Sequence, residues 1–100
     1  MLLGIKLNDG TEIECQGILK DSAQRCLFIH TNSLTPIEAY TKFSDSNLLE
    51  SIIAVKNDKE VKIYNKYTEL FGVQKSDLGD DPNEIMIILK RPEVYDVALK

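Results

Sequence analysis

Three apolar runs lie between Glu60 and Arg91: Val61-Lys62-Ile63-Tyr64, then Tyr67-Thr68-Glu69-Leu70-Phe71-Gly72-Val73, then Glu84-Ile85-Met86-Ile87-Ile88-Leu89-Lys90. All three are rich in aromatic and β-branched residues, which are typical of strands. They predict three strands of one antiparallel sheet, which the rest of the chain would cover. The last run is apolar on both of its faces, which indicates a central strand.

Turn residues predict two β-hairpins. Apolar and polar residues alternate over residues 3–7 and again over residues 11–15, on either side of Asn8-Asp9-Gly10. Gly10 can adopt the positive φ that a tight hairpin turn needs. Asn57-Asp58-Lys59 predicts a second turn of the same kind. Gly17 marks the point where the second strand is expected to bend away from the first hairpin.

A short helix is predicted to begin after Thr35. Threonine is a suitable N-cap, and Pro36 suits the first helical position. Ile37, Tyr40 and Phe43 follow at a spacing that places them on one face. Because so short a helix needs packing to persist, this face is expected to lie on the sheet.

Two further segments complete the expected fold. Cys26-Leu27-Phe28-Ile29-His30 is apolar without alternation, and predicts a central strand covered on both sides. Residues 48–52 fit a helical turn or a strand, and residues 51–55 favour the strand. Together the segments predict an α+β fold that is mostly β, with about six to seven antiparallel strands and one short helix, in a single domain over residues 1–100.

The composition narrows the classes of function. The chain has 12 basic and 16 acidic residues, which argues against a nucleic-acid binder because such proteins need a cationic face. No stretch approaches the roughly 20 apolar residues that span a bilayer, and no signal peptide is expected at Met1. These features predict a protein that has no membrane partner and is cytoplasmic when synthesised, where it is used or from which it is assembled into something larger.

Cys15 and Cys26 are expected to be buried free thiols, and a disulfide between them is the alternative. His30 follows Cys26 by four residues, so the two side chains would share one face of a strand. A Cys/His metal site needs about four ligands, and only Cys15 remains to help. The sequence therefore predicts no metal, no cofactor and no catalytic residue.

An acidic segment follows the second apolar run. Its oxygen-bearing side chains do not have the spacing of a calcium-binding loop, so a solvated turn is the favoured interpretation. A cation site built from these side chains is the alternative. The segment contains Asp77, Asp80, Asp81, Asn83 and Glu84.

Aromatic residues alternate with lysines over residues 62–71, and the tail after Pro92 is apolar. The aromatic rings could stack on bases, but the same pattern is typical of cross-strand pairs in a sheet, which the acidic composition favours. The tail is expected to fold back or to dock on a neighbour. The candidate interface residues are Tyr64, Tyr67, Phe71, Val94, Tyr95 and Val97.

Three runs resemble small proteins encoded by temperate phages of Gram-positive bacteria. They are Ile5-Lys6-Leu7-Asn8-Asp9-Gly10-Thr11-Glu12-Ile13, then Tyr64-Asn65-Lys66-Tyr67-Thr68-Glu69-Leu70, then Ile85-Met86-Ile87-Ile88-Leu89-Lys90. The runs consist of strands and a turn, with no catalytic signature. The resemblance implies a phage-related protein, such as a component of the particle or its tail.

The function predicted from the sequence is a non-enzymatic phage or prophage structural or assembly protein. It would act through contacts with copies of itself or with other particle proteins, because unpaired edge strands can add strands from a neighbour. The alternative is a small phage-encoded inhibitor or regulator that binds a host protein. An enzyme is less favoured, since no acid–base or nucleophile constellation is visible.

Overall fold

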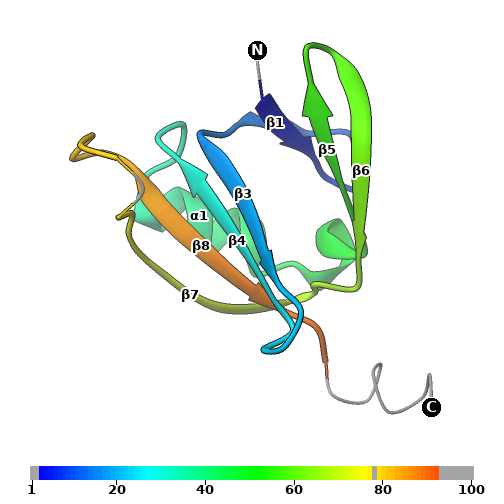
Figure 1. Ribbon diagram of the computed structural model, residues 1–100. Helices are drawn as coiled ribbons and strands as arrows, with labels where there is room; N and C mark the ends of the chain where they lie inside the picture. The colour runs from blue at the N-terminus through cyan, green and yellow to red at the C-terminus, as the bar shows by residue number, and fades with distance from the viewer. Residues whose placement is uncertain (1–2, 78, 93–100) are drawn as a thin grey trace.

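The computed structural model describes residues 3–77 and 79–92. In this part of the chain, eight strands form two four-stranded antiparallel sheets, accompanied by one α-helix and one short 3-10 helix (Figure 1). The predicted α+β, mostly-β fold class is confirmed, with more strands than expected.

The two sheets differ in strand order. Sheet A has the order β2-β1-β5-β6 and sheet B the order β3-β4-β8-β7. Figure 1 shows sheet B on the left, the β5–β6 hairpin of sheet A on the right, and α1 behind β4 and β8. The elements are β1 (Leu3–Lys6), β2 (Glu12–Glu14), β3 (Gly17–Asp21), β4 (Cys26–Thr31), α1 (Pro36–Phe43), the 3-10 helix η1 (Ser46–Leu49), β5 (Ser51–Lys56), β6 (Lys59–Asn65), β7 (Glu69–Lys75) and β8 (Ile85–Lys90).

Both predicted hairpins are confirmed, with β1 paired to β2 and β5 paired to β6. In the first turn, Gly10 has a φ of 89° and Thr11 N donates to Asp9 Oδ1 at 2.9 Å. In the second turn, Asn57 and Asp58 have φ values of 53° and 64°. Two consecutive left-handed residues match the twist of paired strands, so these turn residues fix the register of the hairpin.

The prediction that the three runs after Glu60 form one sheet is wrong. β6 lies in sheet A, whereas β7 and β8 pair with each other in sheet B. The chain changes sheets after Asn65, where Lys66 has a φ of 70° and donates its backbone N–H to Glu50 O at 3.0 Å. This left-handed residue ends β6 and redirects the chain.

The chain also changes sheets at Gly17, where a bend was predicted. Gln16 N donates to His30 O at 2.8 Å, and Gly17 pairs with His30. The strand that begins here, β3, is the additional strand that the sequence did not reveal. Ile18-Leu19 is its only apolar pair, and so short a pair does not show strand periodicity.

Helix α1 begins where it was predicted. Glu38 N donates to Thr35 Oγ1 at 3.2 Å, and Thr35 N donates to Glu38 Oε1 at 2.9 Å, which forms a capping box. Pro36 occupies the first helical position.

The predicted buried face of α1 is corrected by the structure. Ala39 and Phe43, which are four residues apart, are the buried positions. Ile37 and Tyr40 are 79% and 49% exposed. A helix of this length turns a single narrow stripe inward, and that stripe includes Phe43 but not Ile37.

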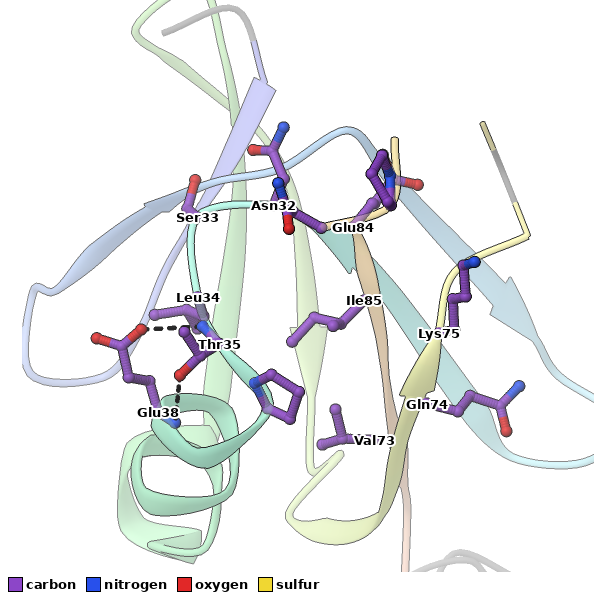
Figure 2. A pocket seen from close by; sticks show the side chains of 13 residues that line it. Asn32, Ser33, Leu34, Thr35, Glu38, Val73, Gln74, Lys75, Glu84 and Ile85 are labelled. Carbon is purple, nitrogen blue, oxygen red and sulfur yellow. Dashed lines mark hydrogen bonds between the residues drawn. The ribbon is translucent and has the colours of Figure 1, made fainter. Parts of the chain in front are cut away.

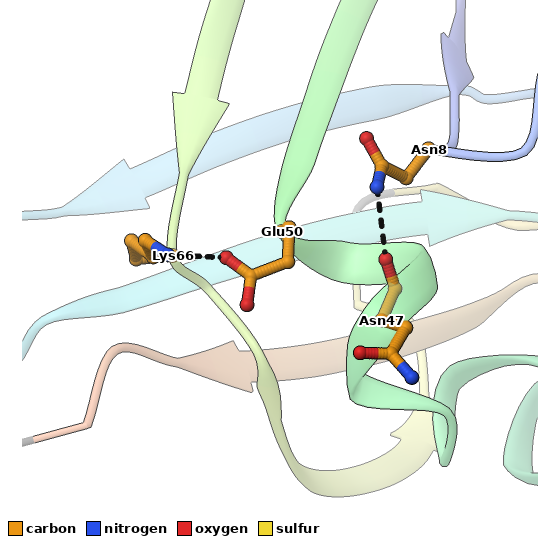
Figure 3. Close-up of polar contacts among 4 residues, drawn as sticks. All are labelled: Asn8, Asn47, Glu50 and Lys66. Atoms are coloured by element: carbon orange, nitrogen blue, oxygen red, sulfur yellow. Dashed lines mark hydrogen bonds and ion pairs between the residues drawn. The ribbon is translucent and has the colours of Figure 1, made fainter.

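The core lies between the inner faces of the two sheets, with α1 and η1 closing it. Asn8 Nδ2 donates to Asn47 O at 3.1 Å, and Lys66 Nζ contacts Glu50 Oε2 at 2.5 Å, so the segment around η1 is tied to both hairpins (Figure 3). The strand prediction for residues 51–55 is confirmed by β5. The fully buried members of the core include Ile5, Leu27, Ile29, Leu49, Ile52, Ile87 and Leu89.

The structure contains no helix, within the ranges that it describes, with the length and hydropathy needed to cross a membrane.

Candidate functional site

The outer face of sheet B carries a line of apolar side chains across all four strands. Leu19 pairs with Phe28, Phe28 with Ile88, and Ile88 with Gly72. The register of β7 shifts between Leu70 and Gly72, which leaves Phe71 as the extra residue beside this line. We call Leu19, Phe28, Phe71 and Ile88 the sheet B row.

Burial distinguishes the two faces of sheet B. Leu27 and Leu89, the neighbours of the row in sequence, are fully buried in the core. Because side chains alternate along a strand, Phe28 and Ile88 must point to the other face. Those two side chains are partly buried, whereas Leu19 and Phe71 are 52% and 65% exposed. The row is therefore most exposed at its two ends, on the edge strands β3 and β7.

The lines on either side of the row differ in charge. On one side the register brings together Asp21, Cys26, Lys90 and Glu69. Lys90 Nζ lies 4.5 Å from the centroid of the Phe71 ring, which confirms that both side chains share the outer face. On the other side the register brings together Gly17, His30, Met86 and Gln74.

His30 belongs to a buried polar network with Ser76 and Glu84. His30 Nδ1 lies 2.7 Å from Ser76 Oγ, and Ser76 Oγ donates to Glu84 Oε2 at 2.5 Å. A serine hydroxyl has one proton, so Ser76 accepts from His30 Nδ1 while it donates to Glu84. Ser76 N also donates to Glu84 O at 3.0 Å. The network therefore joins β4 to the segment between β7 and β8.

The order of groups in this network does not activate the serine. In a nucleophilic triad the imidazole lies between the hydroxyl and the carboxylate, and accepts the hydroxyl proton. Here the Ser76 hydroxyl lies between His30 and Glu84, and His30 Nδ1 is the donor. All three side chains are also buried. The contacts are those of a structural network.

The cysteines and histidine do not gather into one site. Cys26 and His30 share one face of β4, as predicted, and that face is the outer one. Cys15 is part of the core between the sheets. Both cysteines are free thiols, as expected. Burial raises the pKa of the Cys15 thiol to about 12, so the thiol stays protonated and unreactive. The described residues contain no cluster of three or more metal-ligating side chains.

The acidic segment forms a hydrogen-bonded turn. Asp81 Oδ2 accepts from Asn32 Nδ2 at 2.8 Å, and Asp81 Oδ1 accepts from Asn83 N at 2.8 Å. The hydrogen bond from Asn32, and then that from Asn83, hold the pKa of Asp81 below its ordinary value. Glu84 points instead into the network with Ser76. These two carboxylates therefore have different partners and do not converge on one point.

The candidate interface residues have three different environments. Tyr64 and Tyr67 are buried, with ring centroids 6.4 Å apart in an edge-to-face contact. Phe71 is exposed and belongs to the sheet B row. The candidates in the tail, Val94, Tyr95 and Val97, lie outside the described residues. Of the candidates that the structure describes, Phe71 is therefore the one that offers its ring to a partner.

A pocket of about 650 Å³ lies between the start of α1 and the ends of β7 and β8 that face it (Figure 2). Val73 and Ile85 point into the space between α1 and β7 and give the pocket an apolar floor. The capping box already uses the N–H groups of Thr35 and Glu38, and Pro36 has none. This helix end therefore offers few donors to an anion.

Sequence reasoning missed Leu19, Phe28 and Ile88 as surface residues. The segments that contain Phe28 and Ile88 are apolar on both faces, so they were expected to be covered on both sides. Both strands are central, as predicted. On their outer faces Cys26 and His30 are buried, whereas Phe28 and Ile88 are only partly buried. Comparisons with known proteins identify no relative: no family model, no curated protein and no solved structure matches this chain.

Proposed function

We propose that the chain is a non-enzymatic assembly protein of a phage or prophage particle, and that it acts through protein–protein contacts made by the sheet B row. The phage origin rests on the resemblance of the three sequence runs described above. The contact surface rests on one observation, which is the apolar line across four strands, 52% exposed at Leu19 and 65% exposed at Phe71.

The central strands β4 and β8 leave the apolar side chains of Phe28 and Ile88 only partly buried on the outer face of sheet B. Phe28 and Ile88 are flanked on both sides by exposed apolar residues, so the row is continuous and not a set of isolated side chains. Apolar surface removed from water stabilises an interface by roughly 25 cal/mol per Å² before the costs of association. Scattered exposed apolar residues are ordinary, whereas a continuous line is typical of a contact surface.

A second copy of the chain is the first partner to test. A two-fold axis along the row would place Leu19 on Leu19 and Phe71 on Phe71 of the other copy. It would also place the charged line, with Asp21, Glu69 and Lys90, over the line of Gly17, His30, Met86 and Gln74, which contains no carboxylate, lysine or arginine. Opposed like charges, which destabilise a contact, are thereby avoided.

Sedimentation velocity at micromolar concentrations tests the proposal. We expect the wild-type chain to form a discrete oligomer and Phe71→Lys to reduce it to a monomer. Gly72→Arg should also reduce the oligomer to a monomer, because the arginine side chain would project from the sheet B row into the contact. A Cβ at Gly72 would meet no heavy atom within 4 Å, so the substitution should not strain the monomer. Ile37→Lys is the matched control, since Ile37 is exposed on α1, away from the row.

A wild-type monomer, or an oligomer that Phe71→Lys and Gly72→Arg leave intact, would remove the sheet B row as the self-contact. A monomer that retains one host protein from a lysate would favour the inhibitor or regulator instead.

A further inference from the structure

The free edge of sheet A is formed by β6. Among the residues that the structure describes, β6 pairs only with β5, and its other edge is open. Figure 1 shows the β5–β6 hairpin at the right of the molecule, with β6 on the outside. An unpaired edge of seven residues presents backbone N–H and C=O groups to which another strand can bond.

Both faces of β6 are uncovered along most of its length. Residues 59–63 are all exposed, and burial begins only at Tyr64. Two of the exposed residues are apolar and β-branched: Val61 is 58% exposed and Ile63 is 55% exposed. Such side chains favour a strand with neighbours on both sides, so an added strand would cover them.

The charge of the hairpin selects among possible partners. Glu60 pairs with Lys6 at 2.9 Å, which neutralises the carboxylate. In the part of the chain that the structure describes, three lysines of the hairpin have no ion pair: Lys56, Lys59 and Lys62. The same stretch has a single carboxylate without an ion pair, that of Asp58. The hairpin is therefore locally positive in a chain whose net charge is −4.

Lysines on an edge strand and a bulge beside them are devices that prevent unselective pairing. β6 has both, because its register with β5 shifts opposite Ala54 and Val55. A second copy of β6 would bring a second locally positive strand to this edge, which disfavours pairing. A segment with carboxylates would neutralise the lysines and remove this obstacle.

We propose that β6 is a docking edge for an acidic, extended segment of another protein, which adds to sheet A as a fifth strand. The added strand would form backbone hydrogen bonds with β6 and apolar contacts with Val61 and Ile63. Its acidic side chains would be selected by Lys59 and Lys62. The site is distinct from the sheet B row and does not depend on it.

The probe is a short fluorescent peptide of alternating glutamate and valine, titrated into the full chain and followed by anisotropy. We expect binding that weakens as salt is added, and a loss of about tenfold in affinity for the double variant Lys59→Glu with Lys62→Glu. The matched control is Lys42→Glu with Lys75→Glu, which changes the charge equally on α1 and β7 and should bind like the wild type. A peptide of alternating lysine and valine should not bind.

Hydrogen exchange separates strand addition from simple charge attraction. The bound peptide should slow exchange of amides in β6 and leave those of β7 unchanged. The proposal is overturned by no binding, by equal binding of the lysine–valine peptide, by an equal loss in the control variant, or by binding without protection of β6. Tighter binding of a single-stranded oligonucleotide than of the acidic peptide would also overturn it.

Discussion

Replacing Phe43 with alanine should be among the most damaging single changes in this protein. Phe43 is 1% exposed and belongs to the core, where α1 closes the space between the sheets. Truncation of a buried phenylalanine costs about 3–5 kcal/mol, from lost apolar transfer and from the cavity that remains. A domain of this size has a free energy of unfolding of roughly 5–15 kcal/mol, so a large share of the stability would be lost.

Two neighbours on α1 provide the controls for Phe43→Ala. Ile37 is 79% exposed, so Ile37→Ala should change the free energy of unfolding by no more than about 0.5 kcal/mol. Tyr40 is 49% exposed, and Tyr40→Ala should fall between the other two variants. The order Phe43, Tyr40, Ile37 follows from burial alone.

Urea unfolding followed by circular dichroism measures all three variants. With a slope near 1.5 kcal/mol per M, Phe43→Ala should lower the midpoint by about 2–3 M. If Ile37→Ala proves as costly as Phe43→Ala, or Phe43→Ala has no measurable effect, then α1 packs through a different face and the core assignment is refuted. An unchanged slope would show that the variants change stability and not the extent of unfolding.

Three further predictions concern buried and hydrogen-bonded groups. Ser76→Ala should lower the free energy of unfolding, measured in urea, by about 1–3 kcal/mol, because it leaves Glu84 buried without its hydroxyl donor. A loss below about 0.5 kcal/mol would show that the network does not stabilise the fold. Cys15 should resist alkylation by iodoacetamide at pH 8 in the folded protein and react once urea unfolds it, because burial raises the pKa of its thiol to about 12. Rapid alkylation in the folded state would contradict the placement of Cys15 in the core. Asp81 has a pKa below its ordinary value of 3.8, so it contributes stability that is present above pH 3.8 and is lost as the pH falls through the lowered pKa. Asp81→Asn should therefore reduce the fall in Tm between pH 6 and pH 3, and an unchanged fall would show that Asp81 has no such role.

Local chemistry made part of this fold predictable. Asp9-Gly10 and Asn57-Asp58 tolerate positive φ, so the two hairpins could be located from the turn residues alone. Thr35 and Pro36 likewise fixed the start of α1, because a cap acts within one turn of the helix. These features depend on residues that are close in sequence.

The partition of strands between two sheets was not predictable in the same way. It depends on Lys66, which has a φ of 70° between the end of β6 and the start of β7. Lysine rarely adopts this left-handed conformation, so the sequence does not indicate that the chain turns here. The inward face of α1 also depends on long-range packing, since Ile37, Tyr40 and Phe43 fit a helical stripe as well as Ala39 and Phe43 do. Tertiary contacts decide between such alternatives.

On the outer face of sheet B, the burial expected from the sequence differs from the burial in the structure, and this difference bears on the proposed function. The segments that form β4 and β8 are apolar on both faces, a pattern typical of strands that are covered on both sides. The structure covers the faces of Leu27, Ile29, Ile87 and Leu89, and leaves those of Phe28 and Ile88 partly open. The sheet B row is therefore the surface on which the proposed partner would lie.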